Sequence, residues 1–104
     1  MHVLKFELPQ HGVGSFPLSS CGYVLKVGKQ RNRLVVWTLD VPTEEAATVD
    51  VVHTGEVYNQ ASLYLGTVAF HHLADEDFVV HVFLRGRPGH DPRALSSRIS
   101  YSTP

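Results

Sequence analysis

Apolar and polar residues alternate with a period of two along most of the chain, which is typical of half-buried β-strands. Val, Thr, Tyr, Phe and Trp fill short runs, and Gly, Pro, Asn and Asp separate them. About six strands are predicted, at residues 2–8, 22–28, 33–41, 48–54, 63–73 and 78–85. Their short spacing favours hairpin connections, so we expect an all-β fold, either a small antiparallel β-sandwich or a partly open β-barrel.

The segments between and after these runs set the domain organisation. Residues 9–15 (PQHGVGS) are predicted to be a loop, because Gly adopts backbone conformations that other residues avoid. Residues 42–46 interrupt the strand pattern, and Thr43–Glu45 could cap one helical turn. Residues 1–85 are predicted to be one antiparallel β domain. Residues 86–104 are rich in Gly, Pro and Ser, which favours a C-terminal tail or a short helix.

The run at 33–41 is the most apolar of the predicted strands. Alternation places Val35 and Trp37 on one face, which we expect to be the core face with Trp37 at its centre. Leu34 and Val36 lie on the other face, so both sides of this strand are apolar at one end. We therefore expect a central strand, or a strand whose second face is covered.

The charge balance excludes some classes of partner. Nine Lys and Arg residues stand against ten Asp and Glu residues, a net charge of −1, so we expect neither a generic polyanion binder nor a partner of long nucleic acid. The charges are nevertheless uneven: residues 1–33 carry +4, residues 34–84 carry −8 and residues 85–104 carry +3. Such a layout predicts a molecule with opposite poles, unless folding interleaves the segments.

Cysteine usage and hydropathy bear on the compartment. The single cysteine, Cys21, cannot form an intramolecular disulfide and is expected to be a small core residue. No apolar stretch approaches the ~20 residues of a membrane span, and the first residues lack a signal-peptide pattern. We expect a cytoplasmic protein that has no membrane partner.

Four cations surround one predicted turn, at Lys26, Lys29, Arg31 and Arg33. Such a group can bind a phosphate or a carboxylate, and Arg adds bidentate contacts. Tyr23 lies close in sequence and could stack on a planar ring. If the two basic segments meet in space, further cations join the site, at Arg85 and Arg87. The alternative is a solvated hairpin tip.

The histidines suggest a second chemistry. If Leu73 opposes Phe78 in the last hairpin, His72 and His81 are diagonal neighbours on one face, and His53 could converge on them from another strand. Three imidazoles can hold a metal ion, but no Cys-x-x-Cys or His-x-x-x-His spacing supports a site, and half-buried polar histidines are the alternative. No metal or cofactor is therefore predicted. The acidic run at 75–77 is expected to be a solvated turn.

No catalytic motif is present, so we do not expect an enzyme. A nucleophile needs a base within hydrogen-bonding reach and an oxyanion hole, and the sequence has no Gly-x-Ser-x-Gly elbow. Ser19 and Ser20 precede Cys21 in a loop without such a context.

Several landmarks occur in an order that resembles a family of small uncharacterised phage and prophage proteins. The resemblance covers residues 4–84, and the loop at 15–21 departs from it. The landmarks are Lys5–Pro9 (KFELP), Gly22–Gln30 (GYVLKVGKQ), Leu34, Val36–Leu39 (VWTL), Thr54–Gly55, Tyr64–Thr67 (YLGT) and Phe78–Phe83 (FVVHVF). The resemblance implies a phage accessory protein in the bacterial host cytoplasm, and it supplies no catalytic residues.

The leading hypothesis is a non-enzymatic phage accessory binding protein that acts on a host or defence component. It would block a protein surface or sequester a small anionic, nucleotide-like ligand. One alternative is a phage structural or assembly module that forms a homo-oligomer through exposed strand edges. The other is a metal-dependent hydrolase built on His53, His72 and His81.

Overall fold

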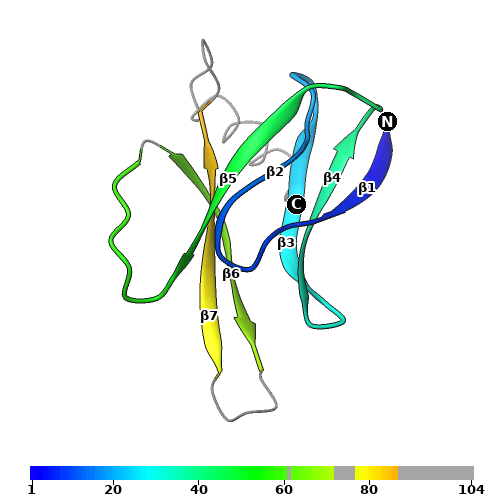
Figure 1. Cartoon of the computed structure of the whole chain (residues 1–104). Helices are drawn as coiled ribbons and strands as arrows, with labels where there is room; N and C mark the ends of the chain where they lie inside the picture. Colours follow the sequence, from blue (N-terminus) through cyan, green and yellow to red (C-terminus); the bar gives the residue numbers. More distant parts are fainter. Residues whose placement is uncertain (61, 72–76, 87–104) are drawn as a thin grey trace.

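The computed structural model describes residues 1–60, 62–71 and 77–86, and these form two antiparallel β-sheets that are not closed into a barrel (Figure 1). The prediction of an all-β fold is confirmed, with seven strands rather than six. The strands are β1 (His2–Glu7), β2 (Gly12–Pro17), β3 (Tyr23–Gln30), β4 (Arg33–Asp40), β5 (Ala46–His53), β6 (Ser62–Phe70) and β7 (Phe78–Arg85). One sheet has the order β1-β4-β3, and the other has the order β2-β5-β7-β6.

No helix occurs in residues 1–60, 62–71 and 77–86, so the helical turn suggested at Thr43–Glu45 does not form. There the Thr43 hydroxyl accepts a hydrogen bond from the Glu45 backbone N–H at 3.0 Å instead. Within these same residues, no helix is long and apolar enough to cross a membrane. The predicted tail at 86–104 lies, from residue 87 onward, outside the described residues.

β2 corrects the prediction of a loop at residues 9–15. It pairs with β5, and Phe16 anchors it in the core with 2% of its surface exposed. Gly14 is required for packing rather than for flexibility, because a Cβ there would lie 2.5 Å from the Pro9 Cδ. Gly14, which had suggested a loop, therefore allows β2 to lie closely against Pro9 after the chain crosses between the sheets.

The core face of β4 is opposite to the predicted one. Leu34 and Val36 are fully buried, whereas Trp37 lies on the outer face and is only half-buried. The buried face also holds Asp40, whose carboxylate accepts hydrogen bonds from the Ser19 backbone N–H at 2.8 Å and from the Ser19 hydroxyl. The predicted central position of this strand is confirmed, since β4 lies between β1 and β3.

The β6–β7 hairpin differs in register from the prediction by three residues. Phe78 pairs with Phe70 rather than with Leu73, and their rings stack with centroids 5.0 Å apart. His81 consequently pairs with Thr67. The predicted neighbour His72 lies outside the described residues.

The two sheets meet along β3 and β6, and the approach is close. A Cβ at Gly66 would lie 2.6 Å from the Val27 Cγ2, so the contact requires glycine. Each of these strands also carries a register irregularity, at Val24/Lys26 in β3 and at Tyr64/Gly66 in β6. Bulges of this kind bend a strand and increase its twist.

Candidate functional site

Two lysines flank the only tryptophan on the outer face of the three-stranded sheet. Lys5 of β1 pairs with Trp37 of β4, and Trp37 pairs with Lys26 of β3. Residues directly opposite each other in an antiparallel ladder project from the same face. The structure therefore places an aromatic ring between two cations that are 21 residues apart in sequence.

The indole of Trp37 lies against the backbone of the neighbouring strand. A Cβ at Gly28 would lie 3.1 Å from the Trp37 Cζ3, so the ring occupies the space over this glycine. The side chain is half-buried as a result. The indole is therefore packed against Gly28 and is partly open to solvent.

A hollow of about 450 Å³ lies beside this row, near the β3–β4 turn. Its lining residues are Lys5, Glu7, Gln30, Arg31, Arg33 and Val35. Arg33 donates to the Glu7 carboxylate at 2.9 and 3.1 Å, and the Lys5 ammonium donates to the Gln30 side-chain oxygen. We call the surface formed by Lys5, Lys26, Arg31, Arg33 and Trp37 the basic face.

The turn beside the hollow has an unusual backbone. The strands leave only Arg31 and Asn32 as the connection, and these have φ angles of 52° and 60°. Positive φ at both central positions is the mark of a type I′ hairpin turn, in which Asn and Gly are the favoured residues. Arg31 therefore holds a conformation that costs a side chain with a Cβ about 1 kcal/mol.

The predicted cations are only partly brought together. Lys26, Arg31 and Arg33 belong to the basic face, and Tyr23 lies on the same outer surface because it pairs with Leu39. Lys29 instead pairs with Leu34 and so projects from the opposite face of the sheet.

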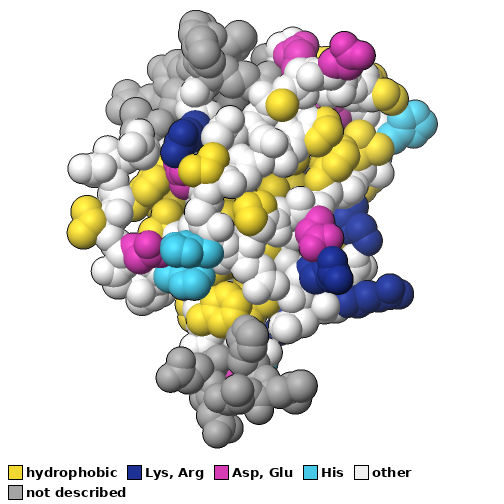
Figure 2. Space-filling model, in the orientation of Figure 1, with side chains coloured by type: hydrophobic (Ala, Val, Ile, Leu, Met, Phe, Trp, Pro, Cys, Tyr) yellow, Lys and Arg dark blue, Asp and Glu magenta, His cyan; other side chains and the backbone are white. Residues whose placement is uncertain are grey.

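Arg85 does not join this group. It ends β7 in the other sheet, and Figure 1 places that end of β7 away from the β3–β4 turn. The Lys and Arg side chains visible in Figure 2 accordingly fall in two separate places. Arg87, the other residue predicted to join, lies outside the described residues.

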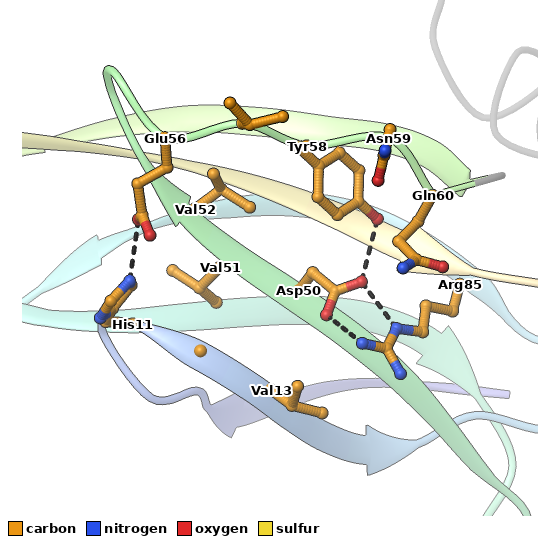
Figure 3. A pocket seen from close by; sticks show the side chains of 12 residues that line it. His11, Val13, Asp50, Val51, Val52, Glu56, Tyr58, Asn59, Gln60 and Arg85 are labelled. Atoms are coloured by element: carbon orange, nitrogen blue, oxygen red, sulfur yellow. Dashed lines mark hydrogen bonds and ion pairs between the residues drawn. The ribbon is translucent and has the colours of Figure 1, made fainter.

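Arg85 instead forms an ion pair with Asp50 on the outer face of the four-stranded sheet (Figure 3). Its Nε and Nη2 donate to the two carboxylate oxygens at 2.7 and 2.6 Å, a bidentate arrangement. The Tyr58 hydroxyl donates to the same carboxylate at 2.9 Å. Only 9% of the Asp50 side chain is exposed. We call these three residues the Asp50 cluster.

The protonation states in this cluster follow from its contacts. Hydrogen bonding from Arg85 lowers the pKa of Asp50, with the Tyr58 hydroxyl contributing in the same direction. The same pairing raises the pKa of Arg85, and burial raises the pKa of Tyr58. The Tyr58 ring stacks on Phe83 with centroids 4.3 Å apart. The Asp50 carboxylate is therefore ionised, paired with Arg85 and bonded to the Tyr58 hydroxyl, and this arrangement indicates a structural role for the cluster.

A cavity of about 230 Å³ extends from the Asp50 cluster toward the turn that follows β5 (Figure 3). At its other end the His11 Nε2 lies 2.8 Å from the Glu56 Oε1. The His11 and His53 rings have centroids 4.3 Å apart. Hydrogen bonding from the His53 backbone N–H lowers the pKa of Glu56, and His11 adds to this effect. We call His11, His53 and Glu56 the histidine cluster.

The histidines that the sequence suggested as a group do not meet. His53 pairs with Val80 and His81 pairs with Val52, so these two histidines project from opposite faces of the four-stranded sheet. Both ring nitrogens of His81 are engaged, Nε2 with the Thr54 hydroxyl at 2.7 Å and Nδ1 with the Thr67 hydroxyl at 2.9 Å. A metal centre built on His53, His72 and His81 is therefore not supported.

Several site residues escaped the sequence analysis. Lys5 and Glu7 lie in a strand distant from the predicted turn, and only the β1–β4 pairing brings them to it. His11 and Glu56 fall in segments interpreted as loops. The one available signal was the spacing of Tyr58 and Asp50, which marks no motif and becomes meaningful only through the fold. Cys21, expected in the core, is exposed.

Comparison with known proteins gives a family but no activity. A family model described as a domain of unknown function, DUF7352, matches residues 1–92. The match extends past residue 84, at which the predicted resemblance ends. No curated protein and no solved structure matches the chain. Because the model covers most of the 104 residues, the chain belongs to the DUF7352 family, whose function is unknown.

Proposed function

We propose that the protein is a non-enzymatic binding protein that holds a small, anionic, nucleotide-like ligand on the basic face. The observation that carries this proposal is the row Lys5–Trp37–Lys26, which lies in register across three strands beside a hollow of about 450 Å³. The volume lies within the range of ~300–1,000 Å³ that is typical of small-molecule sites.

The chemistry of the row suits a planar ring with attached phosphates. A base stacked on an aromatic side chain gains about 1–3 kcal/mol, and the half-buried indole of Trp37 would supply this contact. Phosphate oxygens would then meet Lys5 and Lys26 on either side and the guanidinium of Arg31 in the hollow. The side chains of Lys26 and Arg31 make no hydrogen bond or ion pair within the described part of the chain, so a ligand need not displace one there.

The conformation of Arg31 supports the same interpretation. Asn or Gly would occupy its left-handed backbone position at lower cost, yet the position holds a long cation that lines the hollow. Strained backbone often accompanies functional sites. The strain here is consistent with a contact that the ligand repays.

The biological setting is also part of the proposal. The resemblance to phage and prophage proteins leads us to place the protein in a bacterial host cytoplasm, where it would sequester a ligand used by a host or defence component. Blocking of an acidic protein surface would use the same cations. We favour the small ligand because Lys5, Arg31 and Arg33 line a hollow rather than a flat surface.

The other hypotheses have less support. A homo-oligomer assembled through strand edges would have to use β1 or β2, because the other edge strands, β3 and β6, carry register irregularities and lie against each other. A hydrolase would need the convergence of His53 and His81, which project from opposite faces.

The single tryptophan provides a direct test. Because the chain has one Trp, fluorescence excited at wavelengths beyond the tyrosine absorption band reports on Trp37 alone. Titration with a panel of mono-, di- and cyclic nucleotides should quench this fluorescence with a saturable curve. The matched variants are Lys26→Gln and Lys29→Gln, two lysines of β3 that project from opposite faces of the sheet.

We expect Lys26→Gln to weaken binding about tenfold or more, since one phosphate contact is worth roughly 1.4 kcal/mol or more. Lys29→Gln should bind as the wild type does. Absence of quenching by every nucleotide, or equal weakening by the two variants, would remove the support for a small-ligand site. In that case, binding to an acidic protein that Lys26→Gln still weakens would favour the protein-surface alternative.

A further inference from the structure

The histidine cluster is assembled from three separate segments of the chain. His11 precedes β2, His53 is the last residue of β5 and Glu56 follows Gly55 in the turn after β5. Gly55 has a φ of 98°, and Glu56 donates its backbone N–H to the His53 carbonyl at 3.1 Å. This tight turn brings the Glu56 carboxylate back over the end of β5, where His11 reaches it from the other side.

The hydrogen bonds leave ligand atoms available on two of the three residues. The His53 Nε2 lies 3.1 Å from the Gln10 carbonyl oxygen, which can only accept, so Nε2 carries the proton and Nδ1 keeps its lone pair. Metal-binding histidines are commonly oriented by such a bond to a carbonyl. The Glu56 Oε1 accepts both the His53 N–H and the His11 contact, at 2.7 and 2.8 Å, which leaves Oε2 for a cation.

The distances come close to those of a bound ion. One ligand atom from each residue lies within 4.8 Å of the others. Two ligands of a tetrahedral Zn²⁺ ion with bonds of ~2.0–2.1 Å lie about 3.3 Å apart. His11 and Glu56 are more than 40% exposed, so both can move by the ångström or so that closure requires.

We propose that His11, His53 and Glu56 form a Zn²⁺-binding site. Two imidazoles and one carboxylate are a donor set that suits zinc, whereas Ca²⁺ and Mg²⁺ require mainly oxygen ligands. Three protein ligands leave a fourth position, and His11 and Glu56 also line the 230 Å³ cavity, which has room for water or an anion on the metal (Figure 3). The site is separate from the basic face, because it lies in the other sheet.

The chain supplies a close control for this proposal. His71 lies 2.8 Å from the Asp77 carboxylate, with exposed fractions of 71% and 64%. This pair matches the His11–Glu56 pair in distance and chemistry. Within the described residues, however, it belongs to no group of three potential ligands. His71→Gln and His11→Gln therefore remove equivalent exposed imidazoles, of which only one belongs to the proposed site.

The test measures Zn²⁺ affinity of the full chain by competition with a chromogenic chelator, together with the melting temperature at each zinc concentration. We expect one Zn²⁺ per chain and a higher melting temperature when zinc is bound. His11→Gln should weaken zinc binding by more than about 100-fold, since even outer hydrogen-bond partners of a metal contribute 10–100-fold. His71→Gln should bind zinc as the wild type does.

A second variant guards against misfolding. Glu56→Gln keeps an oxygen that can accept from the His53 backbone N–H but loses the carboxylate charge, so it should fold normally and bind zinc weakly. Co²⁺ in place of Zn²⁺ should give the visible absorption of a tetrahedral centre in the wild type and not in His11→Gln. Failure of the wild type to bind zinc, or equal binding by His11→Gln and His71→Gln, would overturn the proposal.

Discussion

The two outer sheet faces each hold an Arg–carboxylate pair, and the pairs differ in their surroundings. Arg33 and Glu7, on the basic face, keep 65% and 56% of their side chains exposed. In the Asp50 cluster, the Asp50 side chain is only 9% exposed, and Tyr58 adds a third contact. Exposed pairs contribute about 0–1 kcal/mol, whereas loss of one partner of a buried pair leaves an unpaired charge. The same ion pair thus supports the fold in one sheet and stays available to a ligand in the other.

The largest effect expected from this difference is on folding stability. Arg85→Met should lower the free energy of unfolding by about 2 kcal/mol, because Asp50 then keeps a charge with one remaining donor. Arg33→Met should change it by less than about 0.5 kcal/mol. Urea denaturation of the two variants measures both values. Equal destabilisation would mean that burial does not separate the two pairs.

A smaller effect is expected in acid. Because Arg85 lowers the pKa of Asp50 below its ordinary value of 3.8, the unfolded chain binds more protons than the folded chain in this range. This contribution to stability is therefore present above about pH 4 and is lost as the pH falls through the lowered pKa. Urea midpoints between about pH 5 and pH 2 should fall more steeply for the wild type than for Asp50→Asn or Arg85→Met. Identical slopes in all three proteins would contradict this role of Asp50.

Two tyrosines allow the comparison to be sharpened at a single hydroxyl. Tyr58→Phe should cost about 1 kcal/mol of stability, since the ring can still stack on Phe83 but the carboxylate loses one donor. Tyr23→Phe should have no effect on stability, because its hydroxyl makes no hydrogen bond within the described residues. Thermal and urea unfolding of both variants provides the measurement. A loss of stability in Tyr23→Phe would show that the basic face also has a structural role.

The smallest effect is expected at the turn beside the basic face, and it has the opposite sign. Arg31→Asn should raise the free energy of unfolding by about 0.5 kcal/mol, because Asn tolerates the left-handed backbone better than Arg does. The same change should weaken quenching of Trp37 by a nucleotide. A variant that becomes less stable, or that binds as the wild type does, would argue against a functional reason for this arginine.

The sequence predicts strands well where local pattern decides, and less well where distant contacts decide. Both faces of β4 are apolar at its beginning, so alternation could not choose between Val36 and Trp37 as the core residue. The buried face also carries Asp40, whose carboxylate is bonded by Ser19, 21 residues away, and no local pattern indicates that partner. The register of β6 and β7 was missed for a similar reason, since it follows from the stacking of Phe70 on Phe78.

The candidate sites were less predictable than the fold. The turn cations Lys26, Arg31 and Arg33 could be found because they are close in sequence. Their partner Lys5 could not be found, since it reaches the site only through the pairing of β1 with β4. The histidine cluster joins residues up to 45 positions apart, and no spacing along the chain indicates such a contact.

The crossing between β1 and β2 determines how the protein would respond to mechanical load. One continuous segment supplies an outer strand to each sheet, and Leu8 at the crossing is 2% exposed and bonded to the Leu34 carbonyl at 2.9 Å. Tension on the first residue would open the β1–β4 ladder one bond at a time, like a zipper, until the pull reached Leu8. There the force would have to draw a buried side chain out from between the layers, so the crossing would act as a clasp that limits how far the molecule unravels from that end.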